Sequence, residues 1–410
     1  MPVDRAEGGP EVAHGRLIAG VALIVVLATA ACGSGTTSSG GTAPTPSQPL
    51  APFVGTFATV ALPAGVQSLQ DVDCPSATRC WAVGATLGTA QAPSTGAVVT
   101  TSDGGVRWRV QPVPATVGYL TGIVCTSARA CTAVGQVGTN GAGPGAVLTT
   151  ANAGATWTLQ AVPAGTTDVT AVACAPAGTC LALANIAGRV TTLTPGAPGA
   201  GWVARGALPA PVASATGLSC TDGTHCWASA TSTVDVGHAG GAVAATADGG
   251  TTWTLPPVPA GTGALQGIDC TPAAASAAST TSTGSAAARV DCTAVGTTAT
   301  GTGATRTGQG LVLTTGTGGA TWAPATVTAS AAALLAVSCG AGPCVAVGTT
   351  VPSAPQAGIV VLTGSAAPGA FGWRRAAVAG APLPRTGVAC RSLSSCVVVG
   401  ESVAAHLGSG

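Results

Sequence analysis

Residues 120–135 read LTGIVCTSARACTAVG, and this stretch contains the pattern that decides the fold. An apolar segment leads to a cysteine, a short turn follows, and a second cysteine opens another apolar segment. β-Branched residues bounded by small and polar ones are typical of strands and turns, and nothing here repeats at helical spacing. The stretch therefore predicts a β-hairpin with a cysteine on each side of its turn.

The same unit returns along the whole chain, because 14 of the 15 cysteines form close pairs in sequence. The pairs are Cys74/Cys80, Cys125/Cys131, Cys174/Cys180, Cys220/Cys226, Cys270/Cys292, Cys339/Cys344 and Cys390/Cys396. Their spacing, close to 50 residues, is that of one four-stranded propeller blade. Opposed residues of an antiparallel hairpin lie close enough for a disulfide. We therefore expect an all-β fold, a seven-bladed β-propeller over residues 53–410, with one intrablade disulfide per blade.

A metal site is the alternative use of such cysteines. Zinc needs four ligands, whereas each repeat supplies two thiolates and the four histidines are scattered singly. The sequence thus predicts disulfides and neither a metal nor a cofactor.

The two ends of the chain are expected to complete one blade together. Residues 56–64, TFATVALPA, copy residues 156–164, TWTLQAVPA, whereas the last repeat stops without such a strand. We expect residues 53–64 to supply the outer strand of the seventh blade, so that no sheet edge stays open.

A turn motif precedes several of the tryptophans. It is formed by Asp103, Gly105 and Trp108, by Asn152, Gly154 and Trp157, and by Asp248, Gly250 and Trp253. It resembles the Asp-box, or BNR repeat, of sialidase-like, sortilin-like and photosystem II assembly-factor-like propellers. An acid or amide here can cap its own turn while glycine adopts a positive φ. The resemblance implies a structural role away from any active site.

The N-terminus has the features of an export signal. An apolar run from Leu17 to Ala31 is too short to span a membrane and ends in small residues before Cys32. This resembles a bacterial lipobox, which implies a signal peptide over residues 1–31 and lipid on Cys32; an ordinary secretory signal and an uncleaved anchor are the alternatives. Residues 32–52 are rich in Gly, Ser, Thr and Pro, a composition typical of a flexible tether.

Composition and charge exclude several function classes. Only 7% of residues are charged, the net charge is +1, and no basic cluster is present, so nucleic acid is not an expected partner. Sialidase chemistry, as the resemblance implies it, needs an arginine cluster and a Tyr–Glu pair with an Asp. Nothing in this sequence matches that catalytic set residue by residue, so we predict no catalytic residues. The alternative is a glycan hydrolase that uses carboxylates of first strands lining the channel; those carboxylates are Asp71, Asp73, Asp168 and Asp269.

Variable loops between second and third strands should share one face of the propeller, opposite the cysteine turns. Binding is common on such loops, and Tyr119, Asp168, Gln266 and Arg385 begin first strands on that face. The sequence therefore predicts a monomeric, non-catalytic lipoprotein at the outer face of the cell membrane, held by its lipid anchor. We expect its partner to be a protein or glycan of the cell envelope.

Overall fold

The computed structural model describes most of the repeat region. The described residues are 56–88, 93–139, 143–235, 238–272, 290–299, 308–327, 331–340, 344–350, 359–364, 372–375, 377–378, 385–392, 395–401 and 403–407. The predicted signal peptide, Cys32 and the predicted tether lie outside them. Within the described ranges, no helix has the length and apolar character needed to cross a membrane.

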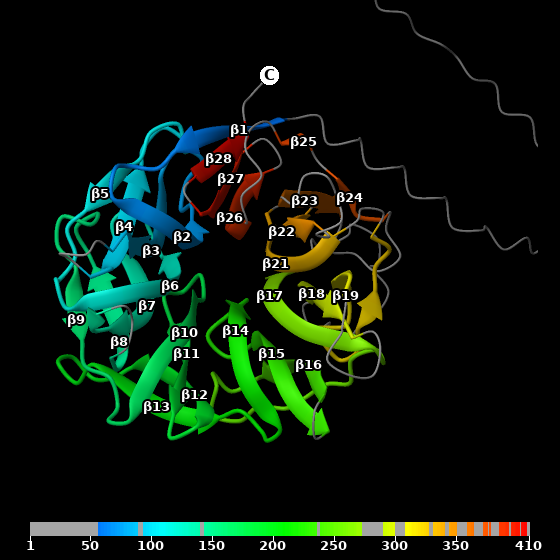
Figure 1. The fold of residues 1–410 in the computed structure, drawn as a ribbon. Coiled ribbons are helices and arrows are strands. Elements are labelled where there is room, and N and C mark those ends of the chain that lie inside the picture. Colours follow the sequence, from blue (N-terminus) through cyan, green and yellow to red (C-terminus); the bar gives the residue numbers. More distant parts are fainter. Residues whose placement is uncertain are drawn as a thin grey trace, which may run out of the picture. The chain divides into compact units, whose positions relative to one another are not determined.

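The described strands form seven sheets (Figure 1). Six consist of consecutive strands, and we number them as blades 1 to 6. Blade 1 contains β2 (Val66–Asp73), β3 (Cys80–Thr86), β4 (Gly96–Thr101) and β5 (Arg109–Gln111). Blade 2 contains β6 (Val117–Cys125), β7 (Cys131–Val137), β8 (Gly145–Thr150) and β9 (Thr158–Gln160). Blade 3 contains β10 (Thr166–Cys174), β11 (Cys180–Ile186), β12 (Arg189–Pro195) and β13 (Trp202–Ala207).

The next three blades follow the same meander. Blade 4 contains β14 (Val212–Cys220), β15 (Cys226–Asp235) and β16 (His238–Thr246). Blade 5 contains β17 (Thr262–Pro272), β18 (Val290–Thr298), β19 (Gly310–Thr315) and β20 (Ala323–Pro324). Blade 6 contains β21 (Ala331–Cys339), β22 (Cys344–Thr350), β23 (Ile359–Gly364) and β24 (Arg374–Arg375).

The remaining sheet, which we call the composite sheet, joins both ends of the described chain. Its strand order is β25–β1–β28–β27–β26. The strands are β1 (Thr56–Ala61), β25 (Ala377–Val378), β26 (Arg385–Ser392), β27 (Ser395–Gly400) and β28 (Val403–Leu407). Strand β1 pairs antiparallel with β28 and parallel with β25.

The prediction of a seven-bladed β-propeller with one intrablade disulfide per blade is therefore wrong, although the predicted pairing of the first and last strands is present. Among the described strands, only six blades are continuous in sequence, blade 4 has three strands, the composite sheet has five, and the seventh disulfide lies in that composite sheet. In blade 4, Thr254 forms only an isolated bridge to Ala245, because Pro256 and Pro257 follow and lack the N–H groups that would extend pairing. In the composite sheet, β25 lies outside β1.

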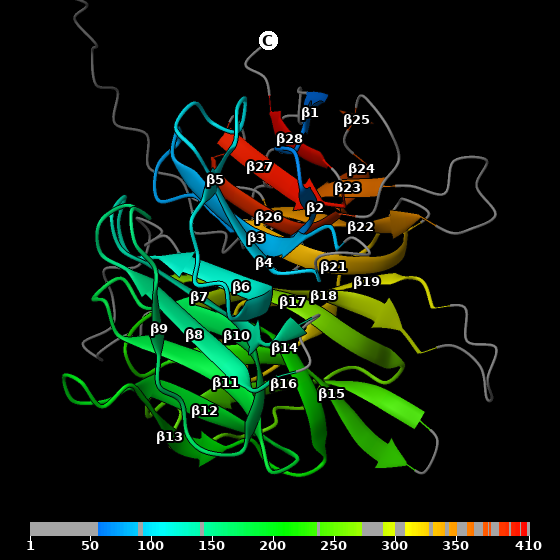
Figure 2. The ribbon, with the colours of Figure 1, turned by 60° about the vertical axis from the view of Figure 1, so that its left-hand side comes forward.

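The sheets pack in a closed ring through their first strands. Each first strand contacts the next, in the order β2, β6, β10, β14, β17, β21 and β26, and β26 contacts β2. These strands lie nearest the centre in Figure 1, and Figure 2 shows the same sheets in a turned view. This arrangement is a β-propeller.

The apolar core consists of clusters between neighbouring sheets. Trp157 of blade 2 packs with Trp81 and Val98 of blade 1, and Trp373 of blade 6 packs with Val312 of blade 5. In the composite sheet, Phe57 takes the equivalent place against blade 6 and is fully buried. The aromatic residue at the start of each outer strand therefore fixes its sheet to the preceding one.

Seven disulfides cross-link the hairpins formed by first and second strands. Six lie in the continuous blades and the seventh, Cys390–Cys396, lies in the composite sheet. Six close rings with sequence separations of 5 or 6, whereas Cys270–Cys292 has a separation of 22. So many disulfides indicate an oxidising setting, extracellular or periplasmic.

Candidate functional site

Every first strand carries a β-bulge that turns one side chain toward the ring axis. The register of β6 on β7 shifts between Leu120 and Gly122, so Thr121 has no partner on the neighbouring strand. A bulge re-aims the side chain of its extra residue. The equivalent residues are Gln70, Thr121, Thr170, Thr216, Gln266, Leu335 and Thr386.

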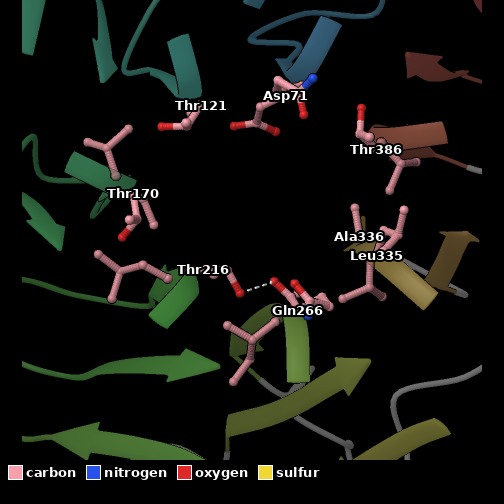
Figure 3. Close-up of a pocket in the computed structure, with 18 residues that line it drawn as sticks. Asp71, Thr121, Thr170, Thr216, Gln266, Leu335, Ala336 and Thr386 are labelled. Carbon is pink, nitrogen blue, oxygen red and sulfur yellow. Dashed lines mark hydrogen bonds between the residues drawn. The ribbon is translucent and has the colours of Figure 1, made fainter. Parts of the chain in front are cut away.

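These seven bulge residues line a central cavity of about 150 Å³ (Figure 3). Four of them are threonines whose hydroxyls donate to backbone carbonyls, three of these on the next sheet: Thr121 to Val169 O at 2.9 Å, Thr170 to Leu183 O at 3.3 Å, Thr216 to Gln266 O at 2.9 Å and Thr386 to Leu69 O at 2.6 Å. A hydroxyl has one proton, so these oxygens offer the cavity only acceptor capacity.

The residue after each bulge is small in all sheets except blade 1. A Cβ at Gly267 would lie 3.0 Å from the Cα of Ala336, and one at Gly387 would lie 2.9 Å from the Cα of Asp71. Neighbouring first strands therefore approach as closely as glycine allows, which keeps the axis narrow. The cavity is well below the roughly 300 Å³ at which ligand pockets begin.

Asp71 is the exception in that ring of small residues, and its carboxyl is labelled in Figure 3. Its two oxygens accept from Val72 N and from Ile123 N, both at 2.9 Å. The side chain keeps some accessible surface at the cavity but lies deep in the ring. Desolvation therefore raises the pKa of Asp71 to about 7, against the lowering effect of those hydrogen bonds.

Two further carboxyls, on the residues that directly precede the first cysteines of blades 1 and 5, connect neighbouring sheets through hydrogen bonds. Asp73 accepts from Cys125 N and Asp269 accepts from Cys339 N, both at 2.6 Å. Desolvation raises the pKa of Asp73, and raises that of Asp269 to about 6. Ser219 and Ser338 accept from Cys270 N and Cys390 N in the same position. These side chains thus satisfy backbone donors between sheets.

A larger hollow of about 410 Å³ lies beside the cavity; we call it the mouth cleft. It is lined by Gln67, Ser68, Gln70, Ala85, Ser94, Gly118, Tyr119 and Glu401. These residues lie where first strands begin and second strands end, opposite the disulfide turns. Gln70 lines both hollows.

The mouth cleft brings together residues of blade 1, blade 2 and the composite sheet. Burial and the nearby carboxylate of Glu401 raise the pKa of Tyr119 above its ordinary value. Glu401 is exposed and forms an antiparallel bridge with Ser68. An aromatic ring, a carboxylate and amide side chains therefore face one solvent-accessible hollow.

The four ligand residues predicted from sequence have different outcomes. Tyr119 lines the mouth cleft and Gln266 lines the central cavity. Asp168 lines neither hollow; it accepts from Asn185 Nδ2 at 3.0 Å and Thr167 Oγ1 at 3.1 Å. The backbone of Arg385 pairs with Gly400, and its side chain lies outside the described set.

Sequence reasoning did not identify Gln67, Gln70 or Glu401 as ligand residues. Two of them lie on β2 near bulges, and a bulge has a sequence signal: buried apolar residues three apart, such as Leu69 and Val72, in place of an alternation of two. Glu401 has no such signal, because only ring closure brings it near Tyr119.

The turns that resemble Asp-boxes lie at the disulfide end, and their acid or amide side chains accept hydrogen bonds within the turn. Asp248 accepts from Thr252 Oγ1, from Thr252 N at 2.8 Å and from Thr251 N at 3.0 Å. These hydrogen bonds, those from Thr252 above all, together with one from Thr246 Oγ1, lower the pKa of Asp248 to about 2. Asp103 and Asn152 cap their turns in the same way, from Arg107 N and Thr156 N. Gly105, Gly154 and Gly250 have positive φ, and Trp108, Trp157 and Trp253 are buried. This is a structural arrangement.

A metal centre has no support among the described residues, since no three His, Cys, Asp or Glu side chains there lie close enough to hold an ion.

No protein-family model matches this chain, and no curated protein matches it. Solved structures do. The structure described as YCF48 bound to D1 peptide has a TM-score of 0.55 at 13% identity, over 87% of this chain and 96% of that chain. A streptogramin B lyase has a TM-score of 0.55 at 12% identity, over 86% and 97%.

A GH74 xyloglucanase from Xanthomonas campestris has a TM-score of 0.47 at 12% identity, over 82% of this chain and 57% of that chain. At such low identity, likeness to solved structures shows the fold alone. The chain shares the β-propeller fold with the first two of these proteins.

Proposed function

We propose that this protein is a binding protein and that a polypeptide partner docks on the mouth cleft. The observation that carries the proposal is the placement of Tyr119 and Glu401, from different sheets, in one open hollow of about 410 Å³. That volume lies within the range of ligand sites, and tyrosine is enriched where proteins bind one another. Of the residues predicted from sequence, Tyr119 remains in the proposal, whereas Gln266 lines the adjoining central cavity.

Two further observations support a peptide. The opposite end of the sheets carries turns whose acid side chains are hydrogen-bonded within the turn, as at Asp248, whereas the exposed side chain of Glu401 lines the mouth cleft. One solved structure with the same fold is bound to a peptide.

The hydrolase alternative receives less support from the central cavity. Among its described lining residues, Asp71 is the only carboxyl and no aromatic residue is present. A glycosidase needs two carboxyls flanking the scissile bond. Asp73 and Asp269, the other channel carboxyls, hold backbone N–H groups of the next sheet.

The test is photo-crosslinking in the cells that produce the protein. A benzophenone amino acid replaces Tyr119 in one sample and Ala128, an exposed residue in the disulfide turn of the same blade, in the other. We expect a polypeptide adduct from position 119 only. Identical adducts from both positions, or saccharide adducts alone, would overturn the proposal.

We also propose that the mature protein begins at Cys32 and is held by lipid at the outer face of the cell membrane. The support is the small-residue motif before Cys32 and the oxidising setting that the disulfides indicate. Labelling with a fatty-acid analogue should mark the native protein and not a Cys32→Ser variant. Equal labelling of both would contradict lipidation at this residue.

A further inference from the structure

Glu401 is the one charged side chain among the described residues that line the mouth cleft. Glu401 contributes a carboxylate, and among the described residues that line the cleft there is no Arg, Lys or His. Glu401 is exposed to solvent where it lines the cleft. Interfaces place opposite charges together, so a negative hollow favours a positive partner group.

The aromatic ring points to the same ligand class. Tyr119 lines the same cleft, and its pKa is raised partly by the charge of Glu401, which places the two groups within electrostatic reach. A cation over a tyrosine face and beside a carboxylate gains from both the ring quadrupole and the ion pair.

The adjoining central cavity contains both acceptors and amide donors. Its threonine protons go to backbone carbonyls, the Asp71 carboxyl accepts from Val72 N and Ile123 N, and the amides of Gln70 and Gln266 also line it. Gln70, which lines both hollows, continues this polar lining to the cleft. The threonine oxygens can still accept a hydrogen bond from a group with several N–H donors.

We infer that the mouth cleft receives a positively charged side chain of the partner polypeptide, lysine or arginine, between Tyr119 and Glu401. This inference rests on the proposed function and names the part of the partner that the cleft recognises. The adjoining central cavity, of about 150 Å³, is too small for more than the tip of a side chain and ordered water.

The single tyrosine of the chain gives a direct test, since ring-¹³C tyrosine yields NMR signals from Tyr119 alone. The probes are acetyl-Gly-Lys-Gly-amide, the same peptide with an acetylated lysine, and acetyl-Gly-Glu-Gly-amide. We expect saturable shifts with the lysine peptide, and at least about fivefold weaker binding of the acetylated one because the cation is lost. The glutamate peptide should cause no shift.

A pair of variants separates the cleft from the rest of this face. Glu401→Gln should weaken lysine-peptide binding about two- to fivefold, as expected for an exposed ion pair. Asp168→Asn removes a carboxyl on the same face but outside both hollows and should leave binding unchanged. Equal binding of lysine and acetyl-lysine peptides, or an unchanged affinity in Glu401→Gln, would overturn the inference.

The two experiments fail independently. Face-specific crosslinks without a lysine preference would leave the proposed function standing and remove the cation site. A lysine preference without any polypeptide crosslink would leave the cation site standing and remove the proposed polypeptide partner.

Discussion

The two ends of each first strand have opposite chemical characters. At the disulfide end, the cysteine turn is covalently closed and the neighbouring turn is bonded to it: Gly104 N donates to Thr78 O in blade 1, and Ala153 N donates to Arg129 O in blade 2. At the other end, bulges direct polar side chains into two hollows. The comparison teaches that stability and binding capacity are placed on opposite faces of the same strands.

The physical reason is the satisfaction of polar groups. A carboxylate that already accepts several local hydrogen bonds, as Asp248 does, has little to offer a ligand. Glu401 and Tyr119 are held by strands from different sheets and face a hollow instead. Substitutions should therefore affect stability at one end and binding at the other.

The largest stability effects are expected at the disulfide end. Replacing both cysteines of Cys270–Cys292 by alanine should lower the free energy of unfolding by about 3 kcal/mol, and the same change at Cys174–Cys180 by about 2 kcal/mol, because loop-closure entropy grows with ring size. Chemical denaturation followed by tryptophan fluorescence measures both. Losses of equal size would show that ring length does not set the stabilisation.

The channel carboxyls should make the fold less stable as pH rises. The pKa of Asp71 is raised to about 7 and that of Asp269 to about 6, so the folded state binds protons that the unfolded state has released above pH 4. Stability is then highest near pH 4–5 and falls, on the order of a few kcal/mol, up to about pH 7.

Denaturation curves of Asp71→Asn between pH 5 and pH 8 test this slope. The variant should be less stable at pH 5, since an amide cannot accept from both Val72 N and Ile123 N, and its stability should depend less on pH. An unchanged slope would mean that Asp71 does not titrate in this range. Below pH 4 the sign reverses, because the lowered pKa of Asp248 makes stability fall as that carboxylate is protonated.

A reciprocal exchange in the turns should have a smaller effect. The turn of blade 5 has Thr317 where Asp248 lies in blade 4, and the Thr317 hydroxyl accepts one backbone N–H, from Thr321. Thr317→Asp should stabilise the protein by roughly 0.5 kcal/mol through better capping. Asp248→Thr should lower the melting temperature. A thermal melt at pH 7 checks both, and shifts in the same direction would contradict the capping role.

The smallest stability effect is expected at the mouth cleft. Glu401→Gln changes an exposed side chain and should alter the free energy of unfolding by less than about 0.5 kcal/mol. Its effect on peptide binding should be the larger one. A marked loss of stability would show that Glu401 supports the composite sheet, and the separation of the two faces would not hold.

Much of the hairpin architecture could be predicted from the sequence, because a disulfide and a turn are local. The cysteine pairs and the strands beside them follow from spacing alone. The composition of each sheet could not be predicted in this way. Whether residues 377–378 lie beside β1, or whether two prolines shorten blade 4 to three strands, depends on backbone pairing between distant segments.

The candidate site was predictable only in part. The sequence predicts that Tyr119 and Gln266 both begin first strands, but only Tyr119 lies near the start of its strand, whereas Gln266 lies at the bulge of β17. The bulges that direct Gln70 and Thr121 toward the axis interrupt the two-residue alternation of a strand. The inward direction of these side chains therefore does not follow from that alternation. Glu401 reaches the cleft through ring closure, which no local pattern records.

The place of β1 in the composite sheet has a consequence for biogenesis. Of the described strands, β1 emerges first from the ribosome and from any export machinery, whereas its partners β25 and β28 belong to the C-terminal part of the chain and emerge after all six continuous blades. Phe57 must then wait in an unpaired segment while six blades form behind it. Because distant pairings are slow and expose strand edges, this segment sets both the final step of maturation and the period in which the protein is most prone to aggregate.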